Sequence, residues 1–185
     1  MCALRAQVHV AMGVLVLAGV TGCSSGGGGQ DVFTGPYAAQ IRAAYESASD
    51  ATSKAALSDG EVTRAEYVSA VDRYVKCVND QGVDMVAHES YGLFSYEVVG
   101  SGADGAMAAC DAIVAPIESV YSAILTNPSN EDPYDLIVAC LKRGNLAPSD
   151  YTTGQFEADL EADAEPFDTS DETFVRCMTN PQAEA

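Results

Sequence analysis

The chain of 185 residues has no tryptophan, only two histidines, and 9 Lys and Arg against 27 Asp and Glu. The net charge of −18 at pH 7 disfavours nucleic acids and anionic lipid headgroups as partners, because both would repel the protein. His9 lies in the N-terminal apolar segment, so His88 is the only histidine in the remainder of the chain. This scarcity restricts the catalytic devices that the chain can build.

The sequence also lacks the motifs of common enzyme classes. It contains no Gly-x-Ser-x-Gly elbow, no His-Glu-x-x-His motif and no glycine-rich phosphate loop between a strand and a helix. A Ser-His-Asp or Cys-His device would have to use His88, and disulfides explain the cysteines better. We therefore expect no enzymatic activity and no cofactor. A hydrolase that uses two carboxylates stays open as the alternative, because acids are plentiful and their separation is unknown.

The first 22 residues have the pattern of a secretory signal peptide. A short start with one basic residue, Arg5, precedes an apolar run that ends at Val20 before small residues. The run from Val10 to Val20 is about half the ~20 residues that a membrane-spanning helix needs. An uncleaved membrane helix is therefore the weaker interpretation.

Val20-Thr21-Gly22-Cys23 resembles the bacterial lipobox. The resemblance implies cleavage between Gly22 and Cys23, a diacylglyceryl group on the Cys23 sulfur, and a fatty acid such as palmitate on the new N terminus. Acyl chains in this number are enough for stable anchoring. We expect a lipoprotein anchored through Cys23 on the extracytoplasmic face of the cell membrane. A plain secretory signal with a chance cysteine is the alternative.

The chain after the signal divides into three expected parts. Residues 23–32 are the lipidated N terminus and a Gly/Ser linker, which behaves as a flexible tether. Residues 33–180 have the length of a single domain with a modest core. Residues 181–185 form a tail.

Four cysteines lie in the expected domain: Cys77, Cys110, Cys140 and Cys177. An even number in an exported protein indicates two disulfides, and four cysteines allow three connectivities. We favour Cys77 with Cys110 and Cys140 with Cys177, because each pair would join helices adjacent in sequence. A zinc site is disfavoured, because no two cysteines stand two to four residues apart.

Apolar residues recur every three or four positions over most of the domain, which predicts helices. Helices are expected over 33–57, 64–81, 104–126 with a kink or break at Pro116, and 133–143. Two more are expected from 152 onward and over 174–178. Capping boxes are expected at Thr63, Thr152 and Thr169. Residues 83–88 and 94–98 are expected to form a hairpin. The fold class is thus mainly α, a disulfide-braced helical domain with one small β-hairpin, bordering on α+β.

Three segments share an apolar residue, then valine, any residue, cysteine and an aliphatic residue: 74–78, 137–141 and 174–178. Together with Asp59-Gly60-Glu61-Val62-Thr63-Arg64-Ala65-Glu66-Tyr67, this pattern resembles uncharacterised small cysteine-containing lipoproteins of high-GC Gram-positive bacteria. The resemblance covers most of residues 33–180. It implies no activity.

Two further features bear on ligands. Tyr91 lies in the expected turn near His88, and the two form a candidate recognition patch. Residues 59–66 look like half of an EF-hand loop, but the first and third ligand positions would be Ala55 and Leu57, which offer no oxygen. No metal site is expected there, because a capping box explains the same residues.

The acidic residues between 157 and 172 are best explained as a solvated surface. Loose binding of divalent cations there is a further alternative. We expect a non-enzymatic binding or scaffold protein of the cell envelope, whose partner is a protein, a peptide or a small ligand.

Overall fold

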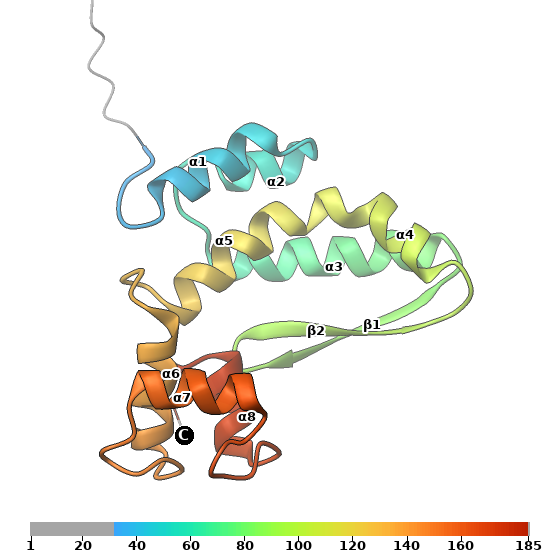
Figure 1. Ribbon diagram of the computed structural model, residues 1–185. Helices are drawn as coiled ribbons and strands as arrows, with labels where there is room; N and C mark the ends of the chain where they lie inside the picture. Colours follow the sequence, from blue (N-terminus) through green and yellow to red (C-terminus); the bar gives the residue numbers. More distant parts are fainter. Residues whose placement is uncertain (1–31, 185) are drawn as a thin grey trace, which may run out of the picture. The chain divides into compact units, whose positions relative to one another are not determined.

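The computed structural model describes residues 32–184 (Figure 1), which belong to one compact unit. The expected signal peptide, the lipobox with Cys23 and the linker up to residue 31 lie outside the described residues. The elements are α1 (Ala38–Ser47), α2 (Ala51–Ala56), α3 (Arg64–Asp80), β1 (Asp84–Ser90), β2 (Leu93–Val99), α4 (Ala103–Cys110), the 3-10 helix η1 (Asp111–Ile113), α5 (Ala115–Thr126), α6 (Pro133–Arg143), α7 (Thr153–Ala162) and α8 (Glu172–Thr179).

The fold class is the one expected from the sequence. The described residues are mainly helical, with one two-stranded antiparallel hairpin. The disulfides join Cys77 to Cys110 and Cys140 to Cys177, with Cα–Cα distances of 5.9 and 5.6 Å. This is the favoured connectivity, and each disulfide joins two different helices.

Local capping signals account for several helix starts. Thr63 and Glu66 form a capping box at the start of α3, and Thr152 and Gln155 form another at the start of α7. Asp132 accepts from the Tyr134 amide and begins α6. These starts were expected, because the donors and acceptors of a capping box are three residues apart and need no distant partner.

Two expected helices differ in the structure. The single helix expected over 33–57 is wrong, because Asp50 accepts from the Ser53 amide and begins a second helix, α2, after α1 ends. The capping box expected at Thr169 is also wrong, because Asp171 accepts from the Thr173 amide and caps α8. In both cases the helix begins after an aspartate, Asp50 or Asp171, whose side chain accepts a hydrogen bond from an amide of the first turn.

The helix expected from 104 to 126 is broken, as the proline predicted. α4 with η1 and then α5 meet at a bend of 72°, and Pro116 lies in the first turn of α5, where its missing N–H is tolerated. No single helix among residues 32–184 is long and apolar enough to cross a membrane. The two bent segments reach that length and apolar composition only when they are counted together.

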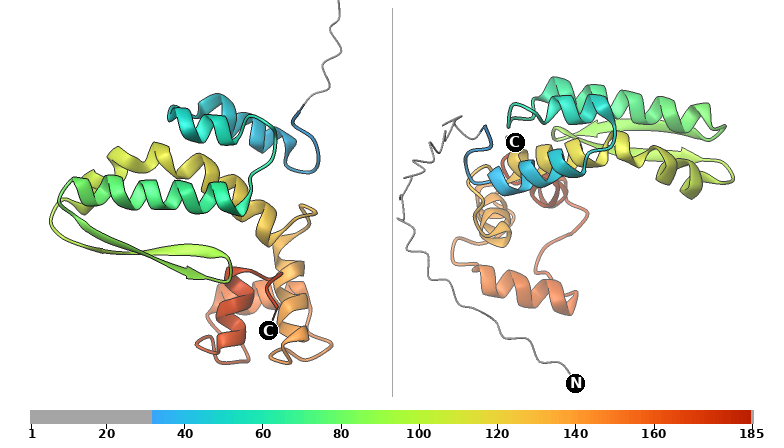
Figure 2. Two further views of the ribbon diagram at one scale, coloured as in Figure 1. Left: turned by 180° about the vertical axis from the view of Figure 1, so that it is seen from behind. Right: turned by 90° about the horizontal axis from the view of Figure 1, so that it is seen from above.

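α3 provides the centre of the first hydrophobic cluster. Figures 1 and 2 show α5 running alongside α3, with α1 and α2 on one side of this pair and the hairpin on the other. The buried residues of α3 lie on one face, at helical spacing: Tyr67, Ala70, Val71, Tyr74 and Val78.

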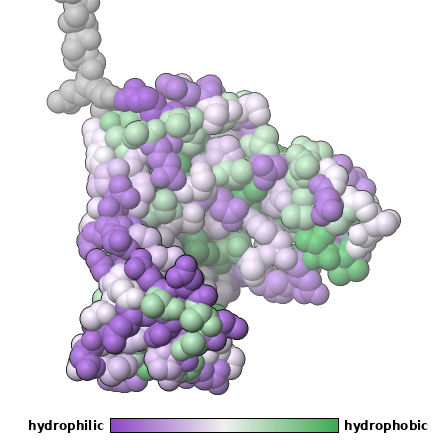
Figure 3. All heavy atoms as spheres, in the orientation of Figure 1, coloured by the Kyte–Doolittle hydropathy of each residue, from purple (hydrophilic) through white to green (hydrophobic). Residues whose placement is uncertain are grey.

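The hairpin turns one face toward α3. Met85 pairs with Val98 and Ala87 with Tyr96, and these residues are buried or partly buried against the first cluster. The opposite face exposes Val86 and Val99. On the face drawn in Figure 3, hydrophobic residues form separate patches among hydrophilic ones.

The second hydrophobic cluster lies between α6, α7 and α8. It contains 8 buried residues, against 18 in the first cluster. Cys140 and Cys177 are fully buried at its centre, beside Leu141 and Phe156. A small core stabilises less than a large one, so this part of the fold depends more on its disulfide.

Reduction of both disulfides in the full chain should therefore open the second cluster first. We expect amide hydrogen exchange to accelerate in α6 and α8 before it accelerates in α3, because about 3 kcal/mol per disulfide is a larger share of a small core's stability. Hydrogen exchange with mass spectrometry, with and without reductant, measures this order. Earlier loss of protection in α3 would contradict the expectation.

A polar network joins α2, α3 and η1. The Asp50 carboxylate accepts from the Ser53 amide at 2.8 Å, the Ser53 hydroxyl at 2.8 Å and Arg73 Nη1 at 2.9 Å. The fully buried Ser53 hydroxyl also reaches the Ile113 carbonyl at 2.7 Å. Burial acts to raise the pKa of Asp50, but these donors outweigh it and lower the pKa below its usual value of 3.8.

Asp50→Asn should lower the free energy of unfolding by about 1–3 kcal/mol near neutral pH, because it removes the charge on which the network converges. A carboxyl whose pKa is lowered by folding stabilises the protein above its unfolded pKa and loses this effect as the pH falls through the folded value. The difference between the variant and the parent should therefore shrink below about pH 4. Urea unfolding across pH measures it.

Asp72→Asn is the matched control, since Asp72 is exposed on α3. A difference for Asp50→Asn that stayed constant down to pH 2.5 would contradict the charge argument.

Candidate functional site

The hairpin turn is fixed by contacts on both sides. Ser90 pairs with Leu93, which leaves the two-residue turn Tyr91-Gly92 with φ of 53° and 84°, as in a type I′ turn. The Tyr91 carbonyl accepts from Asn180 Nδ2 at 3.0 Å. A Cβ on Gly92 would lie 3.0 Å from a methyl carbon of Leu125. The turn is therefore held between α5 and the segment after α8.

The two residues of the expected recognition patch have different surroundings. His88 lies on β1 with 56% of its side chain exposed, and its Nε2 is 3.3 Å from a Glu97 carboxylate oxygen. Tyr91 is partly buried in the turn and lines a hollow beside Arg176. His88 is not among the residues that line this hollow. Joint recognition by the pair stays a prediction.

Two hollows meet at Arg176, and we call them together the arginine recess. The larger has a volume of about 430 Å³ and is lined by Arg143, Gly144, Arg176, Gln182, Ala183 and Glu184. The smaller has a volume of about 230 Å³ and is lined by Tyr91, Glu172, Thr173, Arg176 and Glu184. Arg176 and Glu184 contribute to both.

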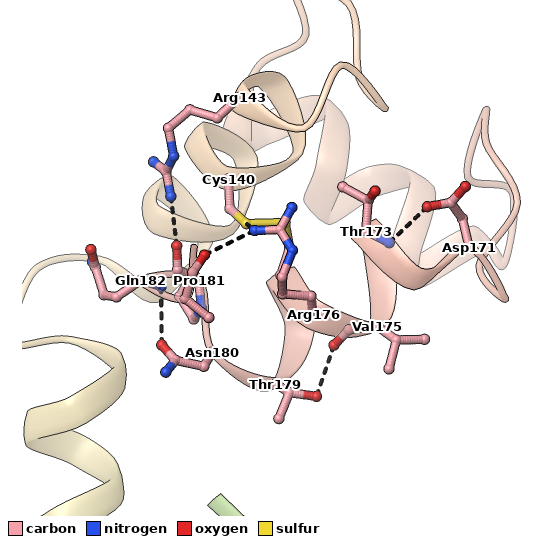
Figure 4. Close-up of a disulfide and its surroundings, with 12 residues drawn as sticks. Cys140, Arg143, Asp171, Thr173, Val175, Arg176, Thr179, Asn180, Pro181 and Gln182 are labelled. Carbon is pink, nitrogen blue, oxygen red and sulfur yellow. Dashed lines mark hydrogen bonds between the residues drawn. A yellow bond between two sulfur atoms is a disulfide. The ribbon is translucent and has the colours of Figure 1, made fainter. Parts of the chain in front are cut away.

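Both arginines hold the segment that follows α8. Arg143 Nη2 donates to the Pro181 carbonyl at 2.6 Å, and Arg176 Nη1 donates to the Ala183 carbonyl at 2.9 Å. Figure 4 shows the two guanidinium groups directed toward this segment, one from α6 and one from α8. Arg176 Nη1 also lies 3.7 Å from the Cys140 sulfur. The partners of both arginines are thus neutral groups.

The surroundings of Arg143 and Arg176 differ from those of the cations that form ion pairs. Arg64, Arg73 and Lys76 each lie within 3 Å of a carboxylate, those of Glu89, Asp50 and Asp80. Within residues 32–184, no carboxylate forms an ion pair with Arg143 or Arg176. Arg176 is nevertheless only 8% exposed. A buried cation without an anion is unusual, because burial of an unpaired charge is unfavourable.

Gly144 lets the end of α6 approach α8 closely beside the recess, because it has no side chain. A Cβ at this position would lie 2.2 Å from Thr173 Cγ2 and 3.3 Å from Arg176 Nη2. The φ of Gly144 is −76°, a value that any residue adopts. Glycine is therefore required here for space, where the end of α6 approaches α8.

The buried Tyr67 and the partly buried Tyr96 and Glu118 form a hydrogen-bonded cluster at the edge of the first hydrophobic cluster. A Glu118 carboxylate oxygen accepts from the Tyr67 hydroxyl at 2.9 Å and the Tyr96 hydroxyl at 3.4 Å. The Tyr67 hydroxyl accepts from the Phe94 amide at 3.2 Å. Burial, and then the negative charge of Glu118, raise the pKa of Tyr96, and burial raises that of Tyr67. Both hydroxyls stay protonated as donors, which makes the cluster a structural link between α3, α5 and β2.

The residues of the EF-hand-like segment have other partners in the structure. A Glu66 carboxylate oxygen accepts from the Thr63 amide and hydroxyl, both at 2.8 Å. Asp59 accepts from the Glu61 amide at 3.1 Å. Across residues 32–184, no three His, Cys, Asp or Glu side chains lie close enough together to hold a metal ion.

Comparisons with known proteins assign no family to the chain. No protein-family model, curated protein or solved structure matches it. The chemistry of the arginine recess is that of several guanidinium donors facing a hollow.

Tyr67→Phe should lower the free energy of unfolding by about 1–3 kcal/mol, because it removes the donor to Glu118 and the acceptor of the partly buried Phe94 amide. Tyr45→Phe is the matched control, since the Tyr45 ring is partly buried and its hydroxyl has no described hydrogen-bond partner. Urea unfolding followed by circular dichroism compares the two. Equal losses in both variants would show that the Glu118 cluster contributes nothing specific.

Proposed function

We propose that the chain is a lipoprotein of the extracytoplasmic face of the cell membrane, anchored through lipid on Cys23. In this proposal it acts as a binding or scaffold protein of the envelope and not as an enzyme, and its partner is a protein, a peptide or a small ligand. The Val20-Thr21-Gly22-Cys23 pattern supports the anchor. The high negative charge disfavours nucleic acid as a partner.

The observation that carries the proposal is a disulfide in each hydrophobic cluster. Cys110, Cys140 and Cys177 are 1%, 0% and 0% exposed, and each lies among buried apolar residues. Disulfides of this kind persist in oxidising compartments and are rare where thiols are kept reduced. They are therefore what an exported protein with a modest core is expected to contain.

The arginine recess supports binding as the role of the exposed domain. An arginine side chain stays protonated, so it donates hydrogen bonds to an anion but does not accept a proton from water. The chemistry of Arg143 and Arg176 therefore favours holding a ligand over activating a nucleophile.

Cys23→Ala should move the chain from the membrane fraction to the soluble fraction, because it removes the sulfur that would carry the diacylglyceryl group. Cys2→Ala is the matched control, since Cys2 lies in the signal that would be removed. Cell fractionation gives the distribution, and mass spectrometry of the N-terminal peptide gives the lipid. An unlipidated N-terminal peptide in the parent chain would overturn the proposed anchor.

A further inference from the structure

We infer that the arginine recess is a binding site for a singly charged carboxylate, such as the free carboxyl group of a small molecule or the C terminus of a peptide. The inference deepens the proposed function by naming the class of ligand. It rests on the proposed function only for the location in which the protein would encounter the ligand, the extracytoplasmic face of the cell membrane. The binding itself depends on residues of α6, α8 and the segment after α8.

The two guanidinium groups have more N–H donors than the neighbouring acceptors use. Each guanidinium carries five N–H donors. Arg143 gives one contact to the Pro181 carbonyl, and Arg176 gives one to Ala183 and a long one to the Cys140 sulfur. No further acceptor for either group is found in residues 32–184. Both therefore retain donors for a ligand in the hollow that they share.

The neighbouring charges decide the class of anion. Glu184 lines both hollows and Glu172 lines the smaller one, and neither forms an ion pair with Arg176. In a chain of net charge −18, each additional negative charge on a ligand increases repulsion. A planar carboxylate also matches the fork of an arginine. The recess therefore favours one carboxylate over a phosphate or a polyanion.

The volume of the larger hollow is suitable for a small ligand. The larger hollow measures about 430 Å³, which is in the range of sites for small ligands. Its lining includes Gly144, where a Cβ would collide with Thr173. Tyr91 lines the smaller hollow, which shares Arg176 and Glu184 with the larger one, so the organic part of a ligand that extends into it meets an aromatic side chain.

The test is a titration of the isotopically labelled full chain, followed by NMR at the Gly144 and Ala183 amides. The probes are N-acetylalanine, its neutral amide and inorganic phosphate. We expect saturable shifts with N-acetylalanine, none with the amide and weaker binding of phosphate. Equal shifts with the amide, tighter binding of phosphate, or no saturation with N-acetylalanine by about 100 mM would overturn the inference.

Two variants and a matched control locate the site. Arg143→Gln and Arg176→Lys should each weaken N-acetylalanine about tenfold or more, because each removes charged or paired hydrogen bonds. Lys142→Gln changes the charge by the same amount one residue away, and should leave the affinity within about twofold. Arg143 is exposed, so its variant should remain folded even if Arg176→Lys does not. Equal weakening in Arg143→Gln and Lys142→Gln would reject a specific site.

The same titration of Cys23→Ala separates this inference from the proposed anchor. Unchanged affinity is expected, because binding does not require the lipid. A chain that binds N-acetylalanine but carries no lipid would disprove the anchor alone. A lipidated chain without saturable binding would disprove the site alone.

Discussion

The Cys140–Cys177 disulfide fixes α6 against α8, and the C-terminal part of the structure depends on this constraint. The 8 buried residues of the second cluster surround it, and a core of this size has little stability to spare. The link also sets the distance between Arg143 and Arg176, which project from the two joined helices. The covalent bond that stabilises the smaller core thus also defines the recess.

Electrostatics give the recess its distinct character. The described ion pairs of Arg64, Arg73 and Lys76 neutralise those cations locally. Arg143 and Arg176 instead donate to main-chain carbonyls, which are dipoles and leave the net charge in place. Two positive groups therefore meet at this recess without an ion pair in the described residues, and the surrounding acids restrict the anions that can approach them.

The sequence predicted those features that depend on neighbouring residues. The capping boxes of α3 and α7, the hairpin and the break near Pro116 follow from local spacing. The start of α2 was missed although its cap is local, because the apolar spacing over 33–57 continues past Asp50 and hides the break. The hydrogen bond from Tyr67 to Glu118 was missed because it spans 51 residues and leaves no periodic signal in the sequence. The recess was missed for the same reason, since Arg143 and Arg176 meet only after α6 and α8 pack.

The hydrogen bond from Asn180 to the Tyr91 carbonyl has a thermodynamic consequence. It joins the hairpin, which packs on the first cluster, to the segment that the two arginines hold. Because the turn and the C-terminal segment share this hydrogen bond, a change that displaces one of them removes a contact of the other.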